Sequence, residues 1–306
     1  MDMEYDVTAS IVLYNNDRTI RNAVRSFLNT SLSVKLYLVD NSETDKQQKL
    51  LSDLLMDDRI EYIFNNKNVG FGKGHNIALE NIYSISRYHL ILNPDVTFEA
   101  GVIEELFDFM ERNEDVGQVL PKVIFKSGEL QKLCKLLPNP FNLFGRRFCM
   151  NFKWAEKLNK QYELDGFNYD RCINLSNLSG CFMFLRTKDV QEIGGFDARY
   201  FMYMEDIDLT RRMHRIANTV FYPYVTIVHE YEKGSYSNIK LLKHHIMSAI
   251  KYFNKWGWIF DMERRRFNAG VIENLKQDLN FNASVYTKFF KPKKHPVKKV
   301  QQQLIK

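Results

Sequence analysis

The feature that most constrains the fold is an alternation of short apolar runs with helical stretches over the first 125 residues. Apolar runs of the length expected for buried strands occupy 10–14, 34–39, 60–64, 89–92 and 116–125. Between them, apolar side chains recur at the period of one helix face, as in Ile20, Val24 and Phe27. Strands that alternate with helices form βαβ units. The sequence therefore predicts an α/β fold with a Rossmann-like, mostly parallel central sheet flanked by helices.

A polar residue stands near the end of four of these predicted strands, namely Asn15, Asp40, Asn68 and Asp95. In open parallel sheets, ligands bind beyond the carboxyl ends of the strands. We therefore expect these side chains to meet at one edge of the sheet, in a pocket of the nucleotide-binding type.

A glycine-spaced turn, GFGKG at 70–74, opens the helix after the third predicted strand. It lacks the G-x-G-x-x-G spacing of a dinucleotide fingerprint, and no G-K-[ST] ends it as in a phosphate loop. Its glycines leave a backbone turn that could approach a base or ribose closely, with Asn76 positioned after it. A plain loop is the alternative.

Asn93-Pro94-Asp95 offers a carboxylate at the tip of a predicted strand, held by a proline turn. Mg²⁺ and Mn²⁺ bind few protein oxygens and leave coordination positions for phosphate oxygens. Asp95 is therefore a candidate ligand for one of these cations. His229, which follows a predicted strand at 219–228, is a candidate member of the same centre. A hydrogen-bonded core histidine is the alternative for His229.

Three acids, Glu205, Asp206 and Asp208, lie close together in the stretch GGFDARYFMYMEDIDLTRR at 194–212. Carboxylates this close repel one another, so a bound cation or a proton to be moved would explain their clustering. The alternative is that they occupy the first turn of a helix, where acids interact well with the backbone dipole. Together with Asp95, they outline one centre in which a metal neutralises a pyrophosphate leaving group and an acid acts as base.

The chain becomes less regular after residue 125. Residues 126–172 indicate a long excursion or partly mobile loop, and 175–185 reads as another strand. Further on, 241–256 carries an apolar helical stripe with lysines around it, which is typical of an interfacial helix; packing on the protein's own core is the alternative. We expect three parts: a globular domain at 1–235, a C-terminal helical extension at 236–282 and a basic, flexible tail at 283–306.

Composition excludes several classes of protein. The amino-terminal MDMEYDV carries acids and leads into an apolar strand, unlike a signal peptide, and no apolar run approaches the roughly 18 residues of a membrane span. The four cysteines form no CxxC pair, which indicates free thiols in a reducing compartment. From residue 283 onward there are seven lysines and no acid, which suits an anionic surface or a solvated end.

Eight short motifs follow one another in a recognisable order: SIVLYNN at 10–16, VDNS at 39–42, NKNVGFGKGHN at 66–76, LNPDV at 92–96, LSGCFMFLR at 178–186, GGFD at 194–197, FMYMEDIDLTRR at 201–212 and HE at 229–230. With these motifs, the chain resembles the inverting glycosyltransferases of family two, which have the GT-A fold. It is most similar to their bacterial rhamnosyltransferase-like branch. The resemblance covers roughly residues 8–235 and not the region after about 260.

The resemblance assigns roles to residues that lie in these motifs. It implies a nucleotide pocket lined by Tyr14, Asn15, Asp40, Asn68 and Asn76. The motifs also supply further candidate substrate-binding residues, namely Asn41, Gly70, Asn93, Gly180 and Arg212. For Arg211 and Arg212, a support role toward the acids or the diphosphate competes with the reading of surface helix arginines.

The resemblance likewise assigns the reacting groups. Asp95 matches the last position of the metal-binding DxD motif, whose first aspartate is replaced here by Asn93. Asp206 matches the catalytic base of the ED motif, with Glu205 as its neighbour. His229 matches a position that contacts the metal or the pyrophosphate in several members. Mg²⁺ or Mn²⁺ is the implied cofactor.

These roles imply an inverting sugar transfer from a dTDP- or UDP-linked donor, with L-rhamnose from dTDP-rhamnose as the first candidate. The implied acceptor is a hydroxyl of a glycan or of a polyprenyl-diphosphate-linked oligosaccharide, in bacterial surface polysaccharide biosynthesis. The expected location is the cytoplasm, peripheral at the inner face of the plasma membrane, with surface contact through 241–306. We expect no nucleic-acid partner, and nothing in the sequence indicates the oligomeric state. The alternatives are a sugar nucleotidyltransferase and a non-catalytic membrane- or nucleic-acid-binding adaptor.

Overall fold

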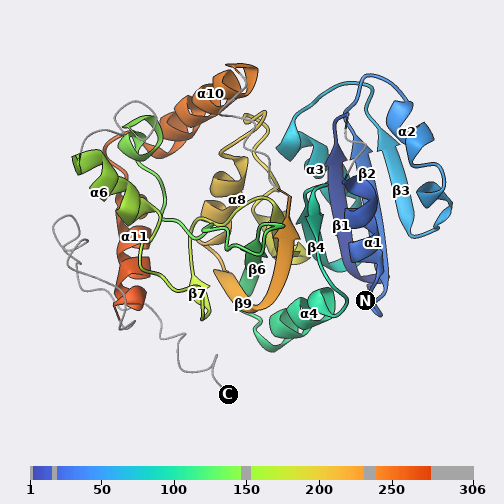
Figure 1. The fold of residues 1–306 in the computed structure, drawn as a ribbon, viewed down its shortest axis with the longest axis horizontal. Coiled ribbons are helices and arrows are strands. Elements are labelled where there is room, and N and C mark those ends of the chain that lie inside the picture. Colours follow the sequence, from blue (N-terminus) through green and yellow to red (C-terminus); the bar gives the residue numbers. More distant parts are fainter. Residues whose placement is uncertain (1–2, 16–18, 146–152, 231–238, 277–306) are drawn as a thin grey trace.

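A computed structural model of the protein describes residues 3–15, 19–145, 153–230 and 239–276 (Figure 1). Its strands are β1 (Tyr5–Leu13), β2 (Val34–Asp40), β3 (Ile60–Phe64), β4 (Ser86–Leu92), β5 (Val96–Thr97), β6 (Val116–Ile124), β7 (Ile173–Asn174), β8 (Phe182–Arg186) and β9 (Asn218–His229). They form one nine-stranded sheet in the order β3-β2-β1-β4-β8-β6-β9-β5, with β7 paired to β9 beside this path.

The first half of the sheet is parallel and the second half is mixed. Strands β3, β2, β1 and β4 pair in parallel, as the alternation of strands and helices predicted. Strand β8 then runs antiparallel to both β4 and β6, while β9 is parallel to β6. The predicted fold class, an α/β protein of the GT-A type, is confirmed, and the strict parallel arrangement ends at β4.

Helices cover both faces of the sheet (Figure 1). They are α1 (Ile20–Leu28), α2 (Lys46–Leu50), α3 (Phe71–Ile82), α4 (Val102–Arg112), α6 (Lys153–Tyr162), α7 (Thr187–Glu192), α8 (Glu205–Met213), α10 (Ile239–Trp256) and α11 (Met262–Leu275), with short turns η1 (Leu54–Met56) and η2 (Phe141–Gly145). Successive side chains of a strand point to opposite faces. Leu90 and Leu92 of β4 therefore pack in one cluster with α1 and α4, whereas Ile91 packs in a second with α3, α7 and α8.

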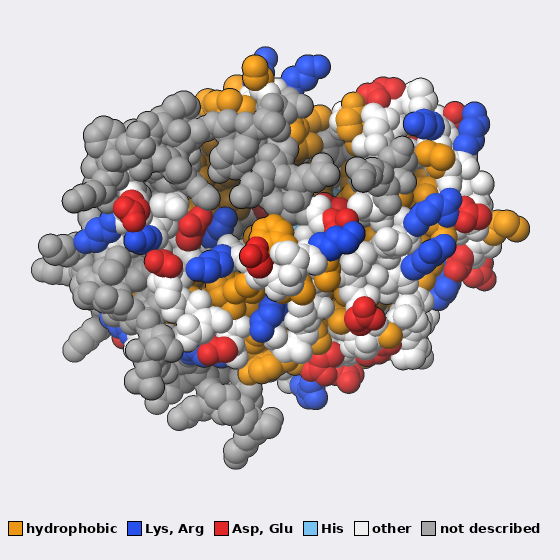
Figure 2. Space-filling model, viewed as in Figure 1, with side chains coloured by type: hydrophobic (Ala, Val, Ile, Leu, Met, Phe, Trp, Pro, Cys, Tyr) orange, Lys and Arg blue, Asp and Glu red, His pale blue; other side chains and the backbone are white. Residues whose placement is uncertain are grey.

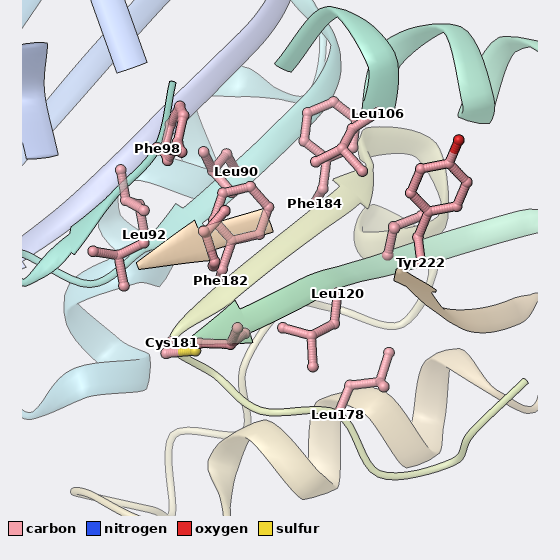
Figure 3. Close-up of a cluster of buried hydrophobic side chains, with 14 of the residues drawn as sticks. Leu90, Leu92, Phe98, Leu106, Leu120, Leu178, Cys181, Phe182, Phe184 and Tyr222 are labelled. Atoms are coloured by element: carbon pink, nitrogen blue, oxygen red, sulfur yellow. The ribbon is translucent and has the colours of Figure 1, made fainter. Parts of the chain in front are cut away.

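The larger of these clusters joins the two halves of the sheet (Figure 3). Phe182 and Phe184 of β8 lie beside Leu90 and Leu92 of β4 in this cluster, and the Phe184 ring stacks on Tyr88 with centroids 5.5 Å apart. All of these side chains are buried. This packing holds β8 against β4. It therefore also determines the position of the segment before β8 at the edge of the sheet.

Two predicted elements are split in the structure. The helical pattern at 46–56, in which Leu50, Leu51, Leu54 and Leu55 recur at helical spacing, divides into α2 and η1 with a turn at 51–53 between them. Of the strand predicted at 175–185, only 182–185 forms a strand, as part of β8, and the short strand β7 lies just before the predicted range. Between them the chain leaves the ladder, and the Asn177 side-chain amide donates to the Leu136 carbonyl at 2.7 Å.

The C-terminal half of α10 packs on the protein's own core. Ala249, Tyr252 and Phe253 are buried against Tyr200 and Met204. The alternative of core packing therefore holds for this part of the predicted stripe. No described helix is long and apolar enough to cross a membrane. The predicted tail at 283–306 and the domain boundary at 235 lie outside the described residues.

The described surface mixes both signs of charge. On the face shown in Figure 2, basic and acidic side chains are interspersed. Exposed apolar side chains gather after α10, where Ile259 is 67%, Phe260 84% and Met262 69% exposed. Arg264 of the following helix is buried, and its Nη1 donates to the Pro138 carbonyl at 3.4 Å.

Arg211 is buried rather than on the helix surface. Its guanidinium forms a two-pronged pair with Asp261, at 2.6 and 2.7 Å, and its Nε donates to Glu263 at 2.9 Å. The side chain of Arg211 is 1% exposed and that of Asp261 is 2% exposed. The guanidinium also lies 4.0 Å from the centroid of the Trp256 ring. This cluster ties α8 to α10 and α11.

We expect Arg211→Met to lower the free energy of unfolding by about 3–5 kcal/mol, because it leaves the Asp261 charge buried without its partner. Chemical denaturation followed by circular dichroism measures this loss. Arg21→Met breaks an ion pair of similar geometry on the surface and is the matched control, with a much smaller expected loss. Equal losses in the two variants would contradict the structural role of Arg211.

Candidate active site

The acid pair Glu205–Asp206 begins helix α8. The two residues before it, Tyr203 and Met204, have φ angles of 69° and 68°, in the left-handed region that side chains other than glycine seldom adopt. Met204 is buried, so the chain enters the helix from a turn that lies in the protein interior. Both acids therefore lie in the first turn of a helix, where the backbone dipole favours negative charge.

Asp206 is held by two backbone amides. Its Oδ1 accepts from its neighbour Ile207 at 2.8 Å, and its Oδ2 accepts from Gly180 at 3.0 Å. A Cβ at Gly180 would lie 2.9 Å from the Cβ of Asp206, so the approach requires glycine there. Burial raises the pKa of Asp206, although the two amides and the charge of Lys135 lower it. These contacts give a fixed carboxylate with increased proton affinity.

Glu205 is more deeply buried than its neighbour. It is 5% exposed, and its Oε2 has no hydrogen-bond partner among the described residues. Burial, followed by the charge of Asp206, raises the pKa of Glu205 to about 8. At neutral pH this pKa favours the protonated form of Glu205, which removes a negative charge from beside Asp206.

Asp208, the third acid of the predicted cluster, is separate from this pair. It is fully buried and binds Arg212 at 2.8 Å, Lys255 at 2.6 Å and the indole Nε1 of Trp256 at 2.8 Å. Pairing with these cations therefore explains why a third acid, Asp208, occurs so close to the other two. A shared reaction centre therefore stays a prediction for Glu205 and Asp206, whereas the carboxylate of Asp208 is occupied by its cationic partners.

Asp95 and His229 face each other across the β5–β9 ladder, in which Val96 pairs with His229. The Asp95 Oδ1 lies 3.5 Å from His229 Nε2. The side-chain amide of Gln131 holds the imidazole from the other side, with Oε1 3.1 Å from Nδ1 and Nε2 donating to the His229 carbonyl at 2.8 Å. Burial lowers the pKa of His229, but Asp95 and the thiol of Cys181 raise it by a larger amount. The net result is a pKa raised to about 10.

One short segment connects these two groups. The Asn93 amide donates to the Cys181 carbonyl at 3.0 Å, two residues before Asp95. The neighbouring Gly180 amide binds Asp206. The segment that leaves the sheet before β8 thus brings the Asp95 turn and the α8 acids to the same edge of the sheet.

The Asp95–His229 pair fits a divalent cation. Asp95 Oδ1 is buried and has no hydrogen-bond partner among the described residues, and it faces an imidazole nitrogen. A carboxylate oxygen and an imidazole are suitable donors for Mn²⁺, and the carboxylate for Mg²⁺. The described residues contain no group of three or more His, Cys, Asp or Glu that could hold a metal ion. A cation held here would take most of its ligands from phosphate oxygens and water.

Several predicted nucleotide-binding residues lie at the ends of β1 and β2. Tyr14 is 49% exposed and its hydroxyl donates to Glu43 at 3.3 Å. Asn15 has φ 50°, and its amide donates to Ser42 Oγ at 3.0 Å. Asp40 is fully buried and accepts from the Ser42 amide and the Tyr62 hydroxyl. Tyr14 therefore offers an accessible ring, whereas Asp40 supports the turn behind it.

The predicted glycine turn is shaped by two asparagines. Asn41 Nδ2 donates to the Gly70 carbonyl at 3.1 Å, and the Gly70 amide donates to Asn68 Oδ1 at 3.0 Å. Gly70 has φ 90°, and a Cβ there would lie 2.2 Å from the Phe201 carbonyl oxygen. Only glycine can occupy this position without displacing Phe201. The turn thus lies directly against the loop that leads to the acid pair.

Asn76 and Arg212 have their polar atoms engaged within the protein. The Asn76 side chain exchanges two hydrogen bonds of 2.8 Å with the backbone of Phe196. Arg212 donates to Asp208 and to the carbonyls of Ile193 and Gly195. These contacts indicate that both hold the loop before α8. A direct contact of either side chain with substrate stays a prediction, and the side chain of Arg212 is only 14% exposed, unlike a surface arginine.

Sequence reasoning missed three residues of the site. Gln131 orients His229 from 98 positions away, and no local pattern marks it. Lys255 and Trp256 were read as part of an interfacial stripe, yet both bind Asp208. The signal that could have identified them is the excess of buried acids on α8, which requires cations elsewhere in the chain.

The chain is similar to known glycosyltransferases. A family model described as glycosyl transferase family 2 matches residues 8–194. The N-acetylglucosaminyl-diphospho-decaprenol L-rhamnosyltransferase of Mycobacterium tuberculosis (strain ATCC 25618 / H37Rv) is 24% identical over 239 residues, which are 73% of this chain and 76% of that protein. The rhamnosyltransferase WbbL of Escherichia coli (strain K12) is 26% identical over 195 residues, or 60% of this chain and 69% of that protein.

Two solved structures share the fold. The chain of GalNAc-T7, crystallised with UDP, GalNAc and Mn²⁺, has a TM-score of 0.62 at 12% identity and aligns over 91% of this chain. The S. aureus TarS structure has a TM-score of 0.54 at 12% identity over 89% of this chain. The chain spans about half the length of these two solved chains, 52% and 44% respectively. Since the family model matches more than half of the chain, the protein belongs to glycosyl transferase family 2.

Proposed function

We propose that the protein is an inverting glycosyltransferase that moves a sugar from a nucleotide-diphospho-sugar to an acceptor hydroxyl, with Asp206 as the base. The observation that carries this proposal is the contact of Asp206 with the Gly180 amide, beside the Cys181–Asn93 link to the Asp95 turn. A fixed base and a phosphate-binding centre at one sheet edge are what in-line displacement at an anomeric carbon requires.

The two acids of the pair have different roles in the proposed reaction. Asp206, whose pKa is raised by burial, accepts the proton of the acceptor hydroxyl as that oxygen attacks the anomeric carbon. Glu205 keeps its own proton at neutral pH, which prevents a second negative charge beside the base. The amides of Gly180 and Ile207 hold the Asp206 oxygens in place. Attack opposite the leaving group inverts the configuration of the sugar.

Asp95 and His229 would hold Mg²⁺ or Mn²⁺. When bound, such a cation supplies positive charge to the diphosphate leaving group. Gln131 keeps the His229 ring facing Asp95. We propose that Asn93, in place of a second aspartate, leaves one carboxylate on the cation.

The donor nucleotide would lie over the ends of β1 and β2. Tyr14 supplies an exposed ring against which the nucleobase can stack. The turn around Gly70 allows the backbone to approach the ribose or diphosphate closely. Asn15, Asp40, Asn41 and Asn68 form the hydrogen-bonded frame of this pocket.

The relatives suggest the sugar and the acceptor. Both are named as rhamnosyltransferases, and the mycobacterial name includes a diphospho-decaprenol acceptor. We propose L-rhamnose from dTDP-rhamnose as the first donor to test, with UDP-sugars next, and a polyprenyl-diphosphate-linked glycan as acceptor. Such an acceptor would place the enzyme at the cytoplasmic face of the membrane, in surface polysaccharide synthesis.

We expect Asp206→Asn to abolish transfer, by a factor of at least about 100 in kcat, while leaving donor binding within a few fold. The amide keeps the shape of the side chain but cannot accept the proton. Release of nucleoside diphosphate from dTDP-rhamnose measures the reaction, whereas release of pyrophosphate from dTTP and a sugar 1-phosphate would instead indicate a nucleotidyltransferase. Retained transfer in the variant would remove Asp206 as the base.

The raised pKa of Glu205 predicts a pH dependence of stability. In the unfolded chain this carboxyl ionises near its ordinary value, whereas in the folded protein it holds its proton up to about pH 8. The free energy of unfolding should therefore fall as pH rises between these values. Glu205→Gln should remove this decline and stabilise the protein at pH 8.5 by a few kcal/mol, since each unit of pKa shift corresponds to about 1.4 kcal/mol.

Thermal melts of both proteins at pH 5 and pH 8.5 test this expectation. Glu80→Gln, on the exposed face of α3, is the matched control and should melt like the wild type at both values. An unchanged pH dependence in Glu205→Gln would mean that Glu205 is ionised in the folded protein.

The cation site predicts metal-dependent diphosphate binding. Asp95→Asn and His229→Gln should each weaken the binding of dTDP in the presence of Mn²⁺ by at least about 10-fold, because each removes one ligand. Calorimetry with Mn²⁺ and with a chelator measures this effect. Thymidine, which has no phosphate, is the control and should bind all three proteins alike. Equal dTDP affinity with and without the cation would contradict the assignment.

A further inference from the structure

We propose that α10 is a positioning element for the acid pair, acting through the loop 197–204 and through Asp208, with Lys255 and Trp256 as positioning residues. The proposal rests on the proposed function for the identity of the reacting acids. The contacts that carry it do not depend on that function.

The loop before α8 requires outside support. Tyr203 and Met204 are consecutive left-handed residues that are not glycine, and such a conformation persists only where its surroundings fix it. The loop also determines where the first turn of α8 starts, and so where Glu205 and Asp206 lie. Its support therefore bears directly on the geometry of the site.

One face of α10 supplies that support. Its contacts recur at helical spacing along the loop: the His244 ring stacks on Phe201 with centroids 4.5 Å apart, Ser248 Oγ donates to the Met202 carbonyl at 2.8 Å, Lys251 Nζ donates to the Arg199 carbonyl at 2.7 Å, and Lys255 Nζ binds Asp197 at 2.7 Å. Residues three and four apart lie on the same side of a helix. A single stripe of α10 thus contacts the loop between Asp197 and Met202.

Asp208 connects the same stripe to α8 itself. Its Oδ1 lies 2.6 Å from Lys255 Nζ and 2.8 Å from Trp256 Nε1. The carboxylate is fully buried and lies within one turn of the start of α8 at Glu205. Lys255 therefore binds both the start of the loop, at Asp197, and the helix that the loop leads into.

The loop also touches the donor turn. The Phe201 carbonyl accepts from the Phe71 amide at 2.9 Å, directly beside Gly70. A displacement of the loop would therefore move the predicted base and the donor turn relative to each other. Misplacement of reacting groups by about 1 Å can reduce a rate by about 100-fold.

The experiment compares four variants. Lys255→Met removes the charge that binds Asp197 and Asp208, and Lys255→Arg restores a charge. Trp256→Phe keeps an aromatic ring but removes the indole donor to Asp208. Lys243→Met changes an exposed lysine of the same helix and serves as the control. The full chain is used throughout.

Two measurements are made on each variant. Hydrogen–deuterium exchange compares peptides covering 197–213 with peptides from β1, and steady-state kinetics with dTDP-rhamnose and Mn²⁺ gives kcat and KM. For Lys255→Met and Trp256→Phe we expect faster exchange at 197–213 alone and a kcat about 10- to 100-fold lower, with a smaller change in KM. Lys255→Arg should recover most of the loss, and Lys243→Met should match the wild type.

The outcomes separate positioning from general stability. Exchange that rises equally in β1 and at 197–213, or an unchanged kcat in both Lys255→Met and Trp256→Phe, would overturn the proposal. If the wild type shows no transfer from dTDP-rhamnose, the proposed donor fails, but the exchange data still decide whether α10 fixes the loop. Unchanged exchange at 197–213 in both variants would overturn it regardless of activity.

Discussion

The site depends on one hydrogen bond, from the Gly180 amide to Asp206. It joins a segment that has left the sheet to a helix that begins far along the chain. On the same segment, the Cys181 carbonyl binds the Asn93 amide, next to Asp95. The interruption between β7 and β8 therefore brings Asp206 and the Asp95 turn to the same short segment of the chain. A continuous strand would have used these backbone groups in the ladder and kept the groups apart.

The charges of the acid pair depend on how differently Glu205 and Asp206 are buried and hydrogen-bonded. Glu205 and Asp206 are neighbours, yet Glu205 has an oxygen without a hydrogen-bond partner among the described residues, while both oxygens of Asp206 accept from amides. Hydrogen bonds favour the charged form and burial favours the neutral form, so the proton resides on Glu205. Asp208 escapes this competition because Arg212 and Lys255 neutralise it. The three acids in this short stretch thus differ: Asp206 is the proposed base, burial favours the protonated form of Glu205, and Asp208 is paired with cations.

The sequence predicted the parts of the fold that local pattern determines. Strand and helix periodicity identified the parallel half of the sheet, because each of those elements buries its own apolar face. It could not predict the break at 175–181, since the contacts that cause it, such as Asn177 with Leu136, join distant parts of the chain. The same limit applies to Arg211, which looks like a surface residue until Asp261 and Glu263 are brought beside it. The side chains that we propose as reacting groups lie in recognisable motifs, whereas no local pattern marks the residues that orient them.

The match to the family model ends at residue 194, before the acid pair, His229 and α10. The matched part contains the parallel strands, the Gly70 turn and Asp95, which together form the predicted donor side. The acids lie in the remaining part, and α8 packs on the core through Leu209 and Met213 while α10 and α11 hold it from behind. Helix α8 thus shares a buried cluster with α3 of the predicted donor side and is held in addition by α10 and α11. Since the loop 197–204 touches both the donor side and α10, through Phe201 and Lys255, it is the place where a change in the C-terminal helices would reach the chemistry.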